Sequence, residues 1–406
     1  MMNKFVFFAN TIKRVGGAQL YIRSKANYLI QKGWTVQIIY HQDGDGYITE
    51  LLNYPSLRCP YLQKPSYMYI ENKRNIIIKQ IARFINSDNS EIVFESHSRT
   101  LASWAEVVAE RIGNVKHICF DLDECISIPE PMFDFYKFKY ERHELYGIQS
   151  ESIKILFNGS NYNLFYGSPR LQAYGASECV ADCPSPYAIE LLKGYVIGIV
   201  GRLEKDYVWE SAKSIKQFVD NHLDHFFTVV FVGGAPDREN PKSRIIQLYN
   251  GCYNTKLLFT GYIFPIPRTL VTLFNICLAG AGSASAICRE GVLTITIDPR
   301  DFQANGILGI TTQSSTFSEM EKKTILWWLE EIFNHDGRYF VSPSEFRYDF
   351  SSHIDAIQES ASLLCYNTSF LFYPLSHLER IKRIINSILP IPIRELMASF
   401  VRLISR

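Results

Sequence analysis

A strand-like segment in the middle of the chain ends in residues that could bind a phosphate group. Gly201 follows the apolar run from Tyr195 to Val200, and Arg202 and Lys205 stand before a helical stretch. A glycine at a strand end lets a ligand approach the backbone, and the next helix begins with unpaired N–H groups and a positive dipole end. Arginine and lysine add the charge that a diphosphate requires. A plain strand end with solvated charges looks the same, so the segment gains meaning only beside similar ones.

Three further loops of small residues also follow predicted strands. Because the strands of a parallel sheet end at one edge, such loops can converge on one ligand, although purely structural turns have the same composition. The loops contain Gly16 and Gly17, then Gly233 and Gly234, and finally Gly282, Ser283 and Ser285.

Titratable side chains follow two strands of the first half. His97 comes after one of them, where an imidazole could hydrogen-bond a bound substrate; a surface or helix-capping histidine is an equal alternative. Asp121, Asp123 and Glu124 follow the next strand and could orient a substrate or act as a base. We favour a solvated acidic loop for these carboxylates, and no further acidic residue stands at the spacing of a metal site.

A second acidic loop follows the strand predicted at 293–297. It contains Asp298 and Asp301 together with Arg300 and Gln303. These side chains could reach a ligand bound at the end of this strand, and we rank this loop above the Asp121 cluster as a candidate binding site. A helix cap formed by Asp301 is the alternative.

The elements that must hold these residues alternate between strand and helix. Apolar strand-like runs recur through both halves, with helical stretches such as 18–31 and 210–221 between them. This alternation predicts parallel, doubly wound sheets. The predicted strands are 4–9, 34–40, 91–95 and 116–120 in the first half, and 195–200, 227–232, 256–259, 276–279 and 293–297 in the second.

The length of the chain indicates two domains. A single core usually stops growing well below 406 residues. We therefore predict an α/β protein with two Rossmann-like doubly wound domains facing a cleft, residues 1–185 and 186–375. The small-residue segment 173–185 is the predicted connection, and residues 376–406 form a separate tail.

Two amphipathic helices are predicted in the tail. Apolar residues recur at helical spacing on both sides of Pro390 and Pro392, and basic residues outnumber acidic ones. The pattern suits docking on an anionic membrane surface or packing on the body of the protein, and we favour packing because core-facing helices share this periodicity. The apolar positions are Leu378, Ile381, Ile384, Ile385, Ile388, Ile393, Leu396, Met397, Phe400 and Ile404.

Charge and cysteine content exclude several classes of function. With 42 Lys and Arg against 41 Asp and Glu, no global field attracts nucleic acid, so we expect no such partner. The nine cysteines are scattered, which is typical of reduced thiols in the cytoplasm, and Cys179 and Cys183 make only half a zinc site. No apolar run is long enough for a signal peptide or a membrane span, so we expect a cytoplasmic protein.

Five short segments occur in an order that is informative as a set. Their order and spacing resemble the glycosyltransferase family 4 type of GT-B enzyme over residues 5 to 310. The resemblance implies transfer of a sugar from a nucleotide-diphosphate sugar to an acceptor hydroxyl, without a metal or another cofactor and with retention of anomeric configuration. The segments are Gly16–Gln19, Phe157–Phe165 with its Asn158-Gly159 element, Val200–Leu203, Phe231–Gly234 and Phe259–Tyr262.

The resemblance also suggests roles for individual residues. Positioned Arg, Lys and N–H donors can stabilise the departing diphosphate in place of a cation. We predict that Arg202, Lys205, Gly16 and Gly17 bind the donor diphosphate and that His97 and Asp121 are catalytic. The predicted donor nucleotide and sugar loop contains Gly234, Gly282, Ser283, Ser285 and Asp298.

The chain departs from the family pattern at its two glutamates. By resemblance these residues contact the sugar and the ribose, but Leu278 and Ala286 occupy their positions and Glu290 is out of register. The family's lysine also stands further from its arginine than Lys205 does from Arg202.

Three functions therefore remain open. The first is a glycosyltransferase of cell-surface polysaccharide assembly, acting on a saccharide or lipid-linked acceptor at the cytoplasmic face of the inner membrane. The second is a non-catalytic GT-B partner subunit whose donor site has decayed. The third, which we favour least, is a nucleotide-sugar 2-epimerase, because it needs acid and base carboxylates around the sugar.

Overall fold

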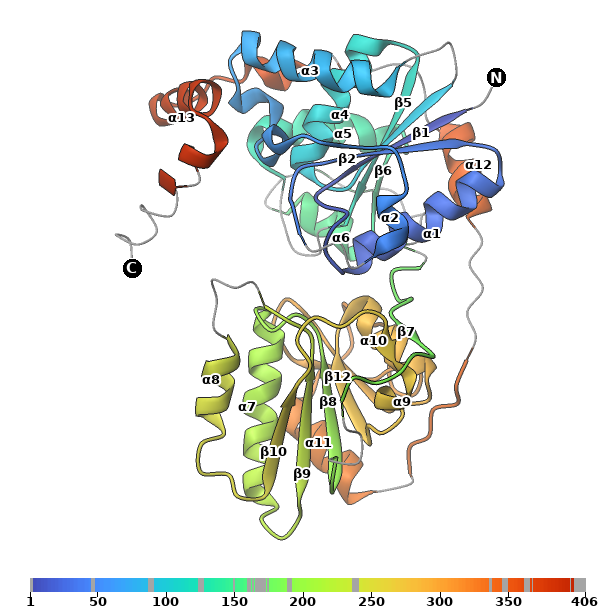
Figure 1. Cartoon of the computed structure of the whole chain (residues 1–406), viewed down its shortest axis with the longest axis vertical. Helices are drawn as coiled ribbons and strands as arrows, with labels where there is room; N and C mark the ends of the chain where they lie inside the picture. Colours follow the sequence, from blue (N-terminus) through green and yellow to red (C-terminus); the bar gives the residue numbers. More distant parts are fainter. Residues whose placement is uncertain are drawn as a thin grey trace. The chain divides into compact units, whose positions relative to one another are not determined.

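The chain divides into two compact units (Figure 1). Met1–Tyr174 and Asp349–Arg406 form the first, and Gly175–Tyr348 form the second. The sequence placed the boundaries at 185 and 375, whereas the chain returns to the first unit at 349. The computed structural model describes residues 3–44, 48–86, 91–122, 128–148, 150–158, 162, 164, 173, 175–187, 192–235, 241–335, 338–344, 350–360, 366, 368–394 and 396–397.

The first unit contains a six-stranded parallel sheet with the order β3-β2-β1-β4-β5-β6. The central strand β1 is buried along its whole length, as expected for a strand covered by helices on both faces. The strands are β1 (Lys4–Ala9), β2 (Thr35–Tyr40), β3 (Ser56–Arg58), β4 (Ile92–Ser96), β5 (Val115–Asp121) and β6 (Leu145–Gly147).

Helices cover both faces of this sheet. Side chains of α1 meet those of β4 and β5 on one face, and α4 and α5 lie on the other. The helix α1 ends before Gly33, whose φ of +82° suits a glycine. The helices are α1 (Gly17–Gln31), α2 (Thr49–Leu52), α3 (Glu71–Ile85), α4 (Arg99–Ile112), α5 (Phe133–Glu141), α6 (Ser150–Leu156), α12 (Ser351–Ser360) and α13 (His377–Ile388).

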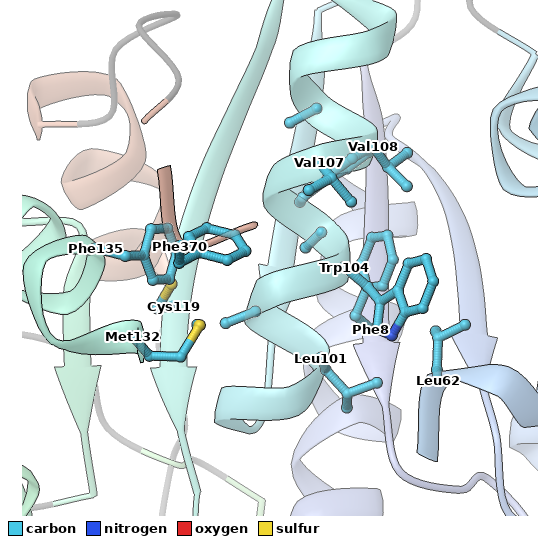
Figure 2. Packing of buried hydrophobic residues seen from close by; sticks show 14 of the residues in the cluster. Phe8, Leu62, Leu101, Trp104, Val107, Val108, Cys119, Met132, Phe135 and Phe370 are labelled. Atoms are coloured by element: carbon cyan, nitrogen blue, oxygen red, sulfur yellow. The ribbon is translucent and has the colours of Figure 1, made fainter. Parts of the chain in front are cut away.

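The helix α4 crosses the centre of a large apolar core. Its residues Leu101, Trp104 and Val108 recur at helical spacing and are buried. Figure 2 shows Trp104 beside Phe8 of β1, while Phe370 from the returning segment lies on the other side of the helix. This packing anchors α4 on the first sheet.

The second unit repeats the doubly wound pattern. Its sheet has the order β10-β9-β8-β12-β13-β14, parallel except for β14. The strands are β8 (Tyr195–Val200), β9 (Phe227–Val232), β10 (Thr255–Phe259), β12 (Ile276–Ala279), β13 (Thr294–Ile297) and β14 (Ala304–Ile307), with a separate pair β7 (Val180–Ala181) and β11 (Ile266–Pro267). The helices are α7 (Asp206–Asn221), α8 (Pro241–Leu248), α9 (Arg268–Val271), α10 (Ala281–Arg289) and α11 (Ile325–Asn334).

The predicted α/β class and both parallel sheets are confirmed. Every strand predicted from an apolar run lies in one of the two sheets. The short strands β3, β6 and β14 were not predicted, and each of them lies at an edge of its sheet. Edge strands need few apolar residues, so their sequence signal is weak.

Candidate functional site

The strand order of each sheet has one point where the chain reverses its direction of winding. In the first sheet this point lies between β1 and β4, and in the second it lies between β8 and β12. Ligands of doubly wound sheets bind outside the carboxyl ends of the strands at such a switch point. The loops that follow these four strands are therefore the first places to look for a site.

The loop after β1 leads into the N-terminus of α1. Gly16 is the N-cap residue, and its carbonyl oxygen accepts hydrogen bonds from the N–H groups of Gln19 and Leu20 at 3.1 Å. No described side chain caps this helix, and its first turn, which begins at Gly17, carries no acidic residue. The positive end of the helix is thus available to an anion.

His97 directly follows β4, on the other side of the same switch point. The ring is buried, and its Nε2 lies 2.9 Å from Oε1 of Glu95. Because an ionised carboxylate only accepts, Nε2 carries the proton and donates. In the described part of the chain Nδ1 has no hydrogen-bond partner. With that proton on Nε2, Nδ1 is a buried nitrogen with no partner of its own at the carboxyl edge of the sheet.

A buried polar network supports His97 from below. Lys25 of α1 pairs with Glu95 through its ammonium group and lies 3.0 Å from the hydroxyl of Tyr21, which itself donates to Glu95 at 2.8 Å. The returning helix α12 adds His353, whose Nδ1 is 3.1 Å from Nζ of Lys25. All four of these supporting side chains are fully buried. Charged groups at such depth need this degree of pairing.

Charge within this network keeps Glu95 ionised. Burial alone would raise the pKa of the Glu95 carboxyl, but the ammonium of Lys25 and the hydrogen bonds from His97 and Lys25 outweigh it. The resulting pKa lies well below the usual range. Burial, with Glu95 beside it, raises the pKa of Tyr21 well above its ordinary value, so the tyrosine stays a donor. Sequence analysis missed Lys25, Tyr21, Glu95 and His353.

Asp121 lies on the opposite face of the sheet from His97. It ends β5 and is buried, and Tyr136 of α5 donates a hydrogen bond to it at 3.5 Å. The side chain of His97 instead meets Tyr21 of α1. The structure therefore does not bring the two predicted catalytic residues together as a pair. Asp123 and Glu124 lie outside the described residues, as do Gly159, Ser160 and Phe165.

In the second unit Arg202 and Lys205 lie beyond the end of β8. Both side chains are exposed, and Nη1 of Arg202 is 3.0 Å from Oε1 of Glu204. Lys205 is the N-cap residue of α7. Glu204 has a second oxygen, Oε2, that is buried without a partner among the described residues. The two cations are thus accessible beside the switch point of the second sheet.

The neighbouring strand β12 leads into α10. Gly280 is the N-cap residue, and Ala281 has a φ of +51°, an uncommon conformation for a residue with a side chain. The N–H of Ala281 donates to the carbonyl oxygen of Ser315 at 2.7 Å. Ser283 stands in the first turn, whereas the hydroxyl of Ser285 bonds to its own helix at Ala281. The first turn of α10 faces the same switch point as Arg202.

Close backbone packing explains several glycines. A Cβ atom at Gly201 would lie 1.8 Å from Oη of Tyr207, and one at Gly233 would lie 2.1 Å from the carbonyl oxygen of Gly201. A Cβ at Gly234 would overlap the ring of Tyr262 at 2.4 Å. Gly282 has a similar constraint, because its Cβ would lie 2.7 Å from the carbonyl oxygen of Ala176. The fold itself therefore requires small residues at these positions.

Asp298 forms an ion-pair cluster inside the second unit. Its carboxylate is fully buried and lies 2.7 Å from both Arg300 and Lys322. Burial raises the pKa, but hydrogen bonds from these two residues and from backbone N–H groups lower it to about 2. Lys322 also pairs with Asp301. Both oxygens of Asp298 are therefore engaged in holding its own loop.

The positions of the two missing glutamates are closed to solvent. Leu278 and Ala286 are both buried, so the donor contacts of the family pattern have no direct counterpart there. Glu290 lies at the C-terminal end of α10, where it pairs with Arg268 at 2.7 Å. It lies at the opposite end of the helix from Ser283 and does not replace either glutamate.

In the described part of the chain, no three His, Cys, Asp or Glu side chains gather in a way that could hold a metal ion. No helix of this part is long and apolar enough to cross a bilayer.

Comparison with solved structures identifies the architecture. A glycosyltransferase from Rickettsia africae ESF-5 superimposes with a TM-score of 0.55 at 15% identity, covering 96% of this chain and 100% of that one. The chain has a GT-B fold. A putative UDP-N-acetylglucosamine 2-epimerase from Listeria monocytogenes matches with a TM-score of 0.49 at 10% identity, over 91% of this chain and 94% of that one.

A third structure is the catalytic domain of starch synthase IV from Arabidopsis thaliana, bound to ADP and acarbose. It matches with a TM-score of 0.47 at 12% identity, covering 88% of this chain and 97% of that chain. No protein-family model matches the sequence, and a comparison with curated proteins finds no match. The GT-B fold is therefore what the comparisons establish.

Proposed function

We propose that this protein transfers a sugar from a nucleotide-diphosphate sugar to a saccharide or lipid-linked acceptor in cell-surface polysaccharide biosynthesis. One observation carries the proposal. Groups suited to a diphosphate flank the switch point of the second sheet, and a histidine with an unused acceptor flanks that of the first. The GT-B fold supports this interpretation because it is a fold of glycosyltransferases.

The donor diphosphate would bind at the second sheet. Arg202, Lys205 and the first turn of α10 at Ser283 can meet the negative charge that grows on the leaving group. The sugar transfer would then proceed without a metal ion and with retention of configuration. Gly234, Gly282 and Asp298 would shape this site through packing and loop geometry, since each already has a structural task.

In the first unit, His97 would accept a hydrogen bond from a sugar or acceptor hydroxyl through Nδ1. Glu95 and Lys25 would act as positioning residues, because they hold the ring in the tautomer that leaves Nδ1 free. The N-terminus of α1 at Gly16 and Gly17 would add N–H donors for phosphate. Asp121 lies on the other face of the sheet, so we rest the catalytic proposal on His97.

We further propose that the enzyme works in the cytoplasm, in peripheral contact with the inner membrane where a lipid-linked acceptor would be found. The absence of a membrane-spanning helix among the described residues is compatible with such contact.

A non-catalytic partner subunit is the second candidate. The observation that favours it is the burial of Leu278 and Ala286 where the family pattern has glutamates. The retained cations beside the switch point favour a working donor site instead. A nucleotide-sugar 2-epimerase is the third candidate, and the separation of His97 from Asp121 gives it no acid and base pair.

Thermal unfolding of the purified protein with a panel of nucleoside diphosphates and nucleotide sugars tests the donor site. A ligand at one hundred times its Kd stabilises the folded state by about 2.7 kcal/mol, so binding raises the Tm. We expect one base to raise the Tm of the wild type and of Lys193→Ala, and the shift to disappear in Arg202→Ala. Lys193 is the matched control because it is exposed and precedes the same strand β8.

The other outcomes of this experiment are informative as well. If no nucleotide shifts the Tm of the wild type, the donor site has decayed and the partner-subunit function is favoured. If Lys193→Ala loses the shift together with Arg202→Ala, the effect is one of overall charge and the assignment of Arg202 is wrong.

A further inference from the structure

The helix α13 is an amphipathic helix that exposes its apolar side. It begins at a capping box, in which Ser376 accepts a hydrogen bond from the N–H of Glu379 and the carboxylate of Glu379 accepts one from Ser376. No residue of the helix is buried. The exposed fractions of its apolar side chains are 60% for Leu378, 43% for Ile381, 50% for Ile384 and 69% for Ile388.

The polar side of α13 makes the contacts with the first unit. Arg383 donates to the carbonyl oxygen of Tyr69 at 3.0 Å, and Asn386 donates to that of Met68 at 3.5 Å. The hydroxyl of Ser387 accepts from the N–H of Ile70 at 2.8 Å. A helix that packs on a protein body normally turns its apolar stripe inward. Here the hydrogen bonds fix the opposite orientation, which leaves the apolar side without a protein partner in the described chain.

The exposed apolar surface continues past the end of the helix. Ile393, Leu396 and Met397 have exposed fractions of 46%, 72% and 46%. Arg394 of the same segment lies 3.4 Å from the hydroxyl of Tyr69, so this turn is held to the first unit by a polar contact as well. In Figure 1 α13 and this turn stand at the margin of the first unit, beyond α3. We call this surface, from Leu378 to Met397, the α13 face.

The charge of the segment indicates what covers the α13 face. Between 378 and 397 it carries four basic residues and two acidic residues, Glu379 and Glu395. Lys382 stands one helical turn from Leu378 and from Ile385, so its stem can lie along the apolar stripe while its ammonium reaches a surface. Two copies of this chain would bring like charges together, whereas an anionic lipid surface complements them.

We propose that the α13 face docks on an anionic lipid surface, with its isoleucine and leucine side chains among the acyl chains and its exposed basic residues, Arg380 and Lys382, at the headgroups. This inference deepens one part of the proposed function, the peripheral membrane contact, and rests on that part alone. The capping box and the contacts with Tyr69 and Ile70 hold the helix in the docking orientation before it meets the lipid. The proposed membrane contact is independent of whether a nucleotide sugar binds.

Flotation of the full chain with vesicles tests the proposal. The vesicles contain phosphatidylcholine alone or phosphatidylcholine with one third phosphatidylglycerol. We expect the wild type to float with the anionic vesicles only, with binding weakened by high salt. Ile381→Asp/Ile388→Asp should bind at least tenfold less. Leu223→Asp/Tyr253→Asp is the matched control, because it adds the same charge at two exposed apolar positions of the second unit and should bind like the wild type.

Three results would overturn the inference. The wild type does not bind anionic vesicles, or the Ile381 and Ile388 variant binds as well as the wild type, or the wild type sediments as a dimer that this variant converts to a monomer. The last result would assign the α13 face to a second copy. The nucleotide-induced Tm shift is measured on the same variant. If that shift persists while vesicle binding is lost, the donor site and the membrane contact are separate, and failure of one does not imply failure of the other.

Discussion

Nε2 of His97 lies 2.9 Å from Oε1 of Glu95, and both side chains are buried at the carboxyl end of β4. The carboxylate is held ionised by Lys25, which itself lies on α1 beneath the loop of Gly16 and Gly17. The imidazole is therefore oriented before any substrate arrives. Orientation of this kind is what an active-site group requires when its contribution depends on one nitrogen.

Replacement of Glu95 by Gln should invert the tautomer of His97. A glutamine amide can donate to Nε2, which would move the ring proton to Nδ1 and remove the free acceptor. We expect kcat to fall about 10²-fold or more, within the range of a lost acid–base or orienting contact, with the Kd of the nucleotide unchanged. Glu91→Gln is the control, because Glu91 precedes β4 at the end opposite to Glu95 and pairs there with Lys116. Equal activity in both variants would exclude a positioning role for Glu95.

Removal of the cation beneath His97 should destabilise the first unit. Lys25→Met leaves the carboxylate of Glu95 buried without its ion-pair partner. Breaking a buried pair in this way costs about 3–5 kcal/mol of unfolding free energy. Urea denaturation followed by circular dichroism measures the loss. The double variant Lys25→Met/Glu95→Gln should recover part of it, and no recovery would show that the loss comes from packing.

The stability of the protein should also depend on pH through Glu95. Its pKa in the folded chain is depressed below the ordinary value of 4.5, so the unfolded chain binds this proton at a higher pH than the folded chain does. The stabilisation that the ionised Glu95 gives to the folded state is complete above pH 4.5 and is lost as the pH falls below this value. The free energy of unfolding then changes by at most about 1.4 kcal/mol per pH unit for one proton. Urea midpoints between pH 6 and pH 3.5 measure the slope. Glu95→Gln should show a shallower decline than the wild type, and parallel curves would contradict the ion pair.

The glycine at the end of β9 should tolerate no side chain. Gly233→Ala places a Cβ 2.1 Å from the carbonyl oxygen of Gly201, on a backbone with a φ of +143°. We expect the free energy of unfolding to fall by more than about 2 kcal/mol, since strain and overlap add. Gly251→Ala is the control, because its φ of +86° is also positive but its Cβ would meet nothing within 4 Å. Equal losses in the two variants would mean that conformation alone matters.

Asp298 should matter for stability more than for donor binding. Asp298→Asn removes the charge that Arg300 and Lys322 share, and we expect a loss of about 1–3 kcal/mol in unfolding free energy. The nucleotide-induced Tm shift should remain, because Oδ1 already accepts from Arg300 and Oδ2 from Lys322. If Asp298→Asn loses the nucleotide-induced Tm shift while its free energy of unfolding is unchanged, Asp298 contacts the donor.

The sequence predicted the buried strands well because their signal is local. The runs that became β1, β8, β9 and β12 are apolar except for Lys4 and Thr228, as central parallel strands mostly are, and glycine-containing loops follow them. The loops that contain the predicted glycines and the two cations therefore lie at the carboxyl ends of these strands, as predicted. The short edge strands and the return of the chain to the first unit depend on tertiary contacts that no periodicity encodes.

The candidate site was predicted less completely than the strands, although part of the signal was present in the sequence. Lys25 and Glu95 are single charges within elements that are otherwise buried on that side, and such charges are almost always paired. That signal could have identified the network below His97. The partner His353 lies far along the chain, and the face of the sheet on which Asp121 falls depends on strand register. Neither can be derived from short motifs.

The most direct test of sugar transfer is the fate of the donor. The wild type is incubated with a panel of nucleotide sugars and a bacterial lipid extract as the source of acceptors, and the nucleotides are followed by mass spectrometry. We expect the wild type to release a nucleoside diphosphate from one donor, and we expect this release to be lost in His97→Ala and in Arg202→Ala. An intact donor converted to an isomer of equal mass would indicate an epimerase. A donor that raises the Tm but is never consumed would contradict catalysis and indicate a non-catalytic GT-B subunit.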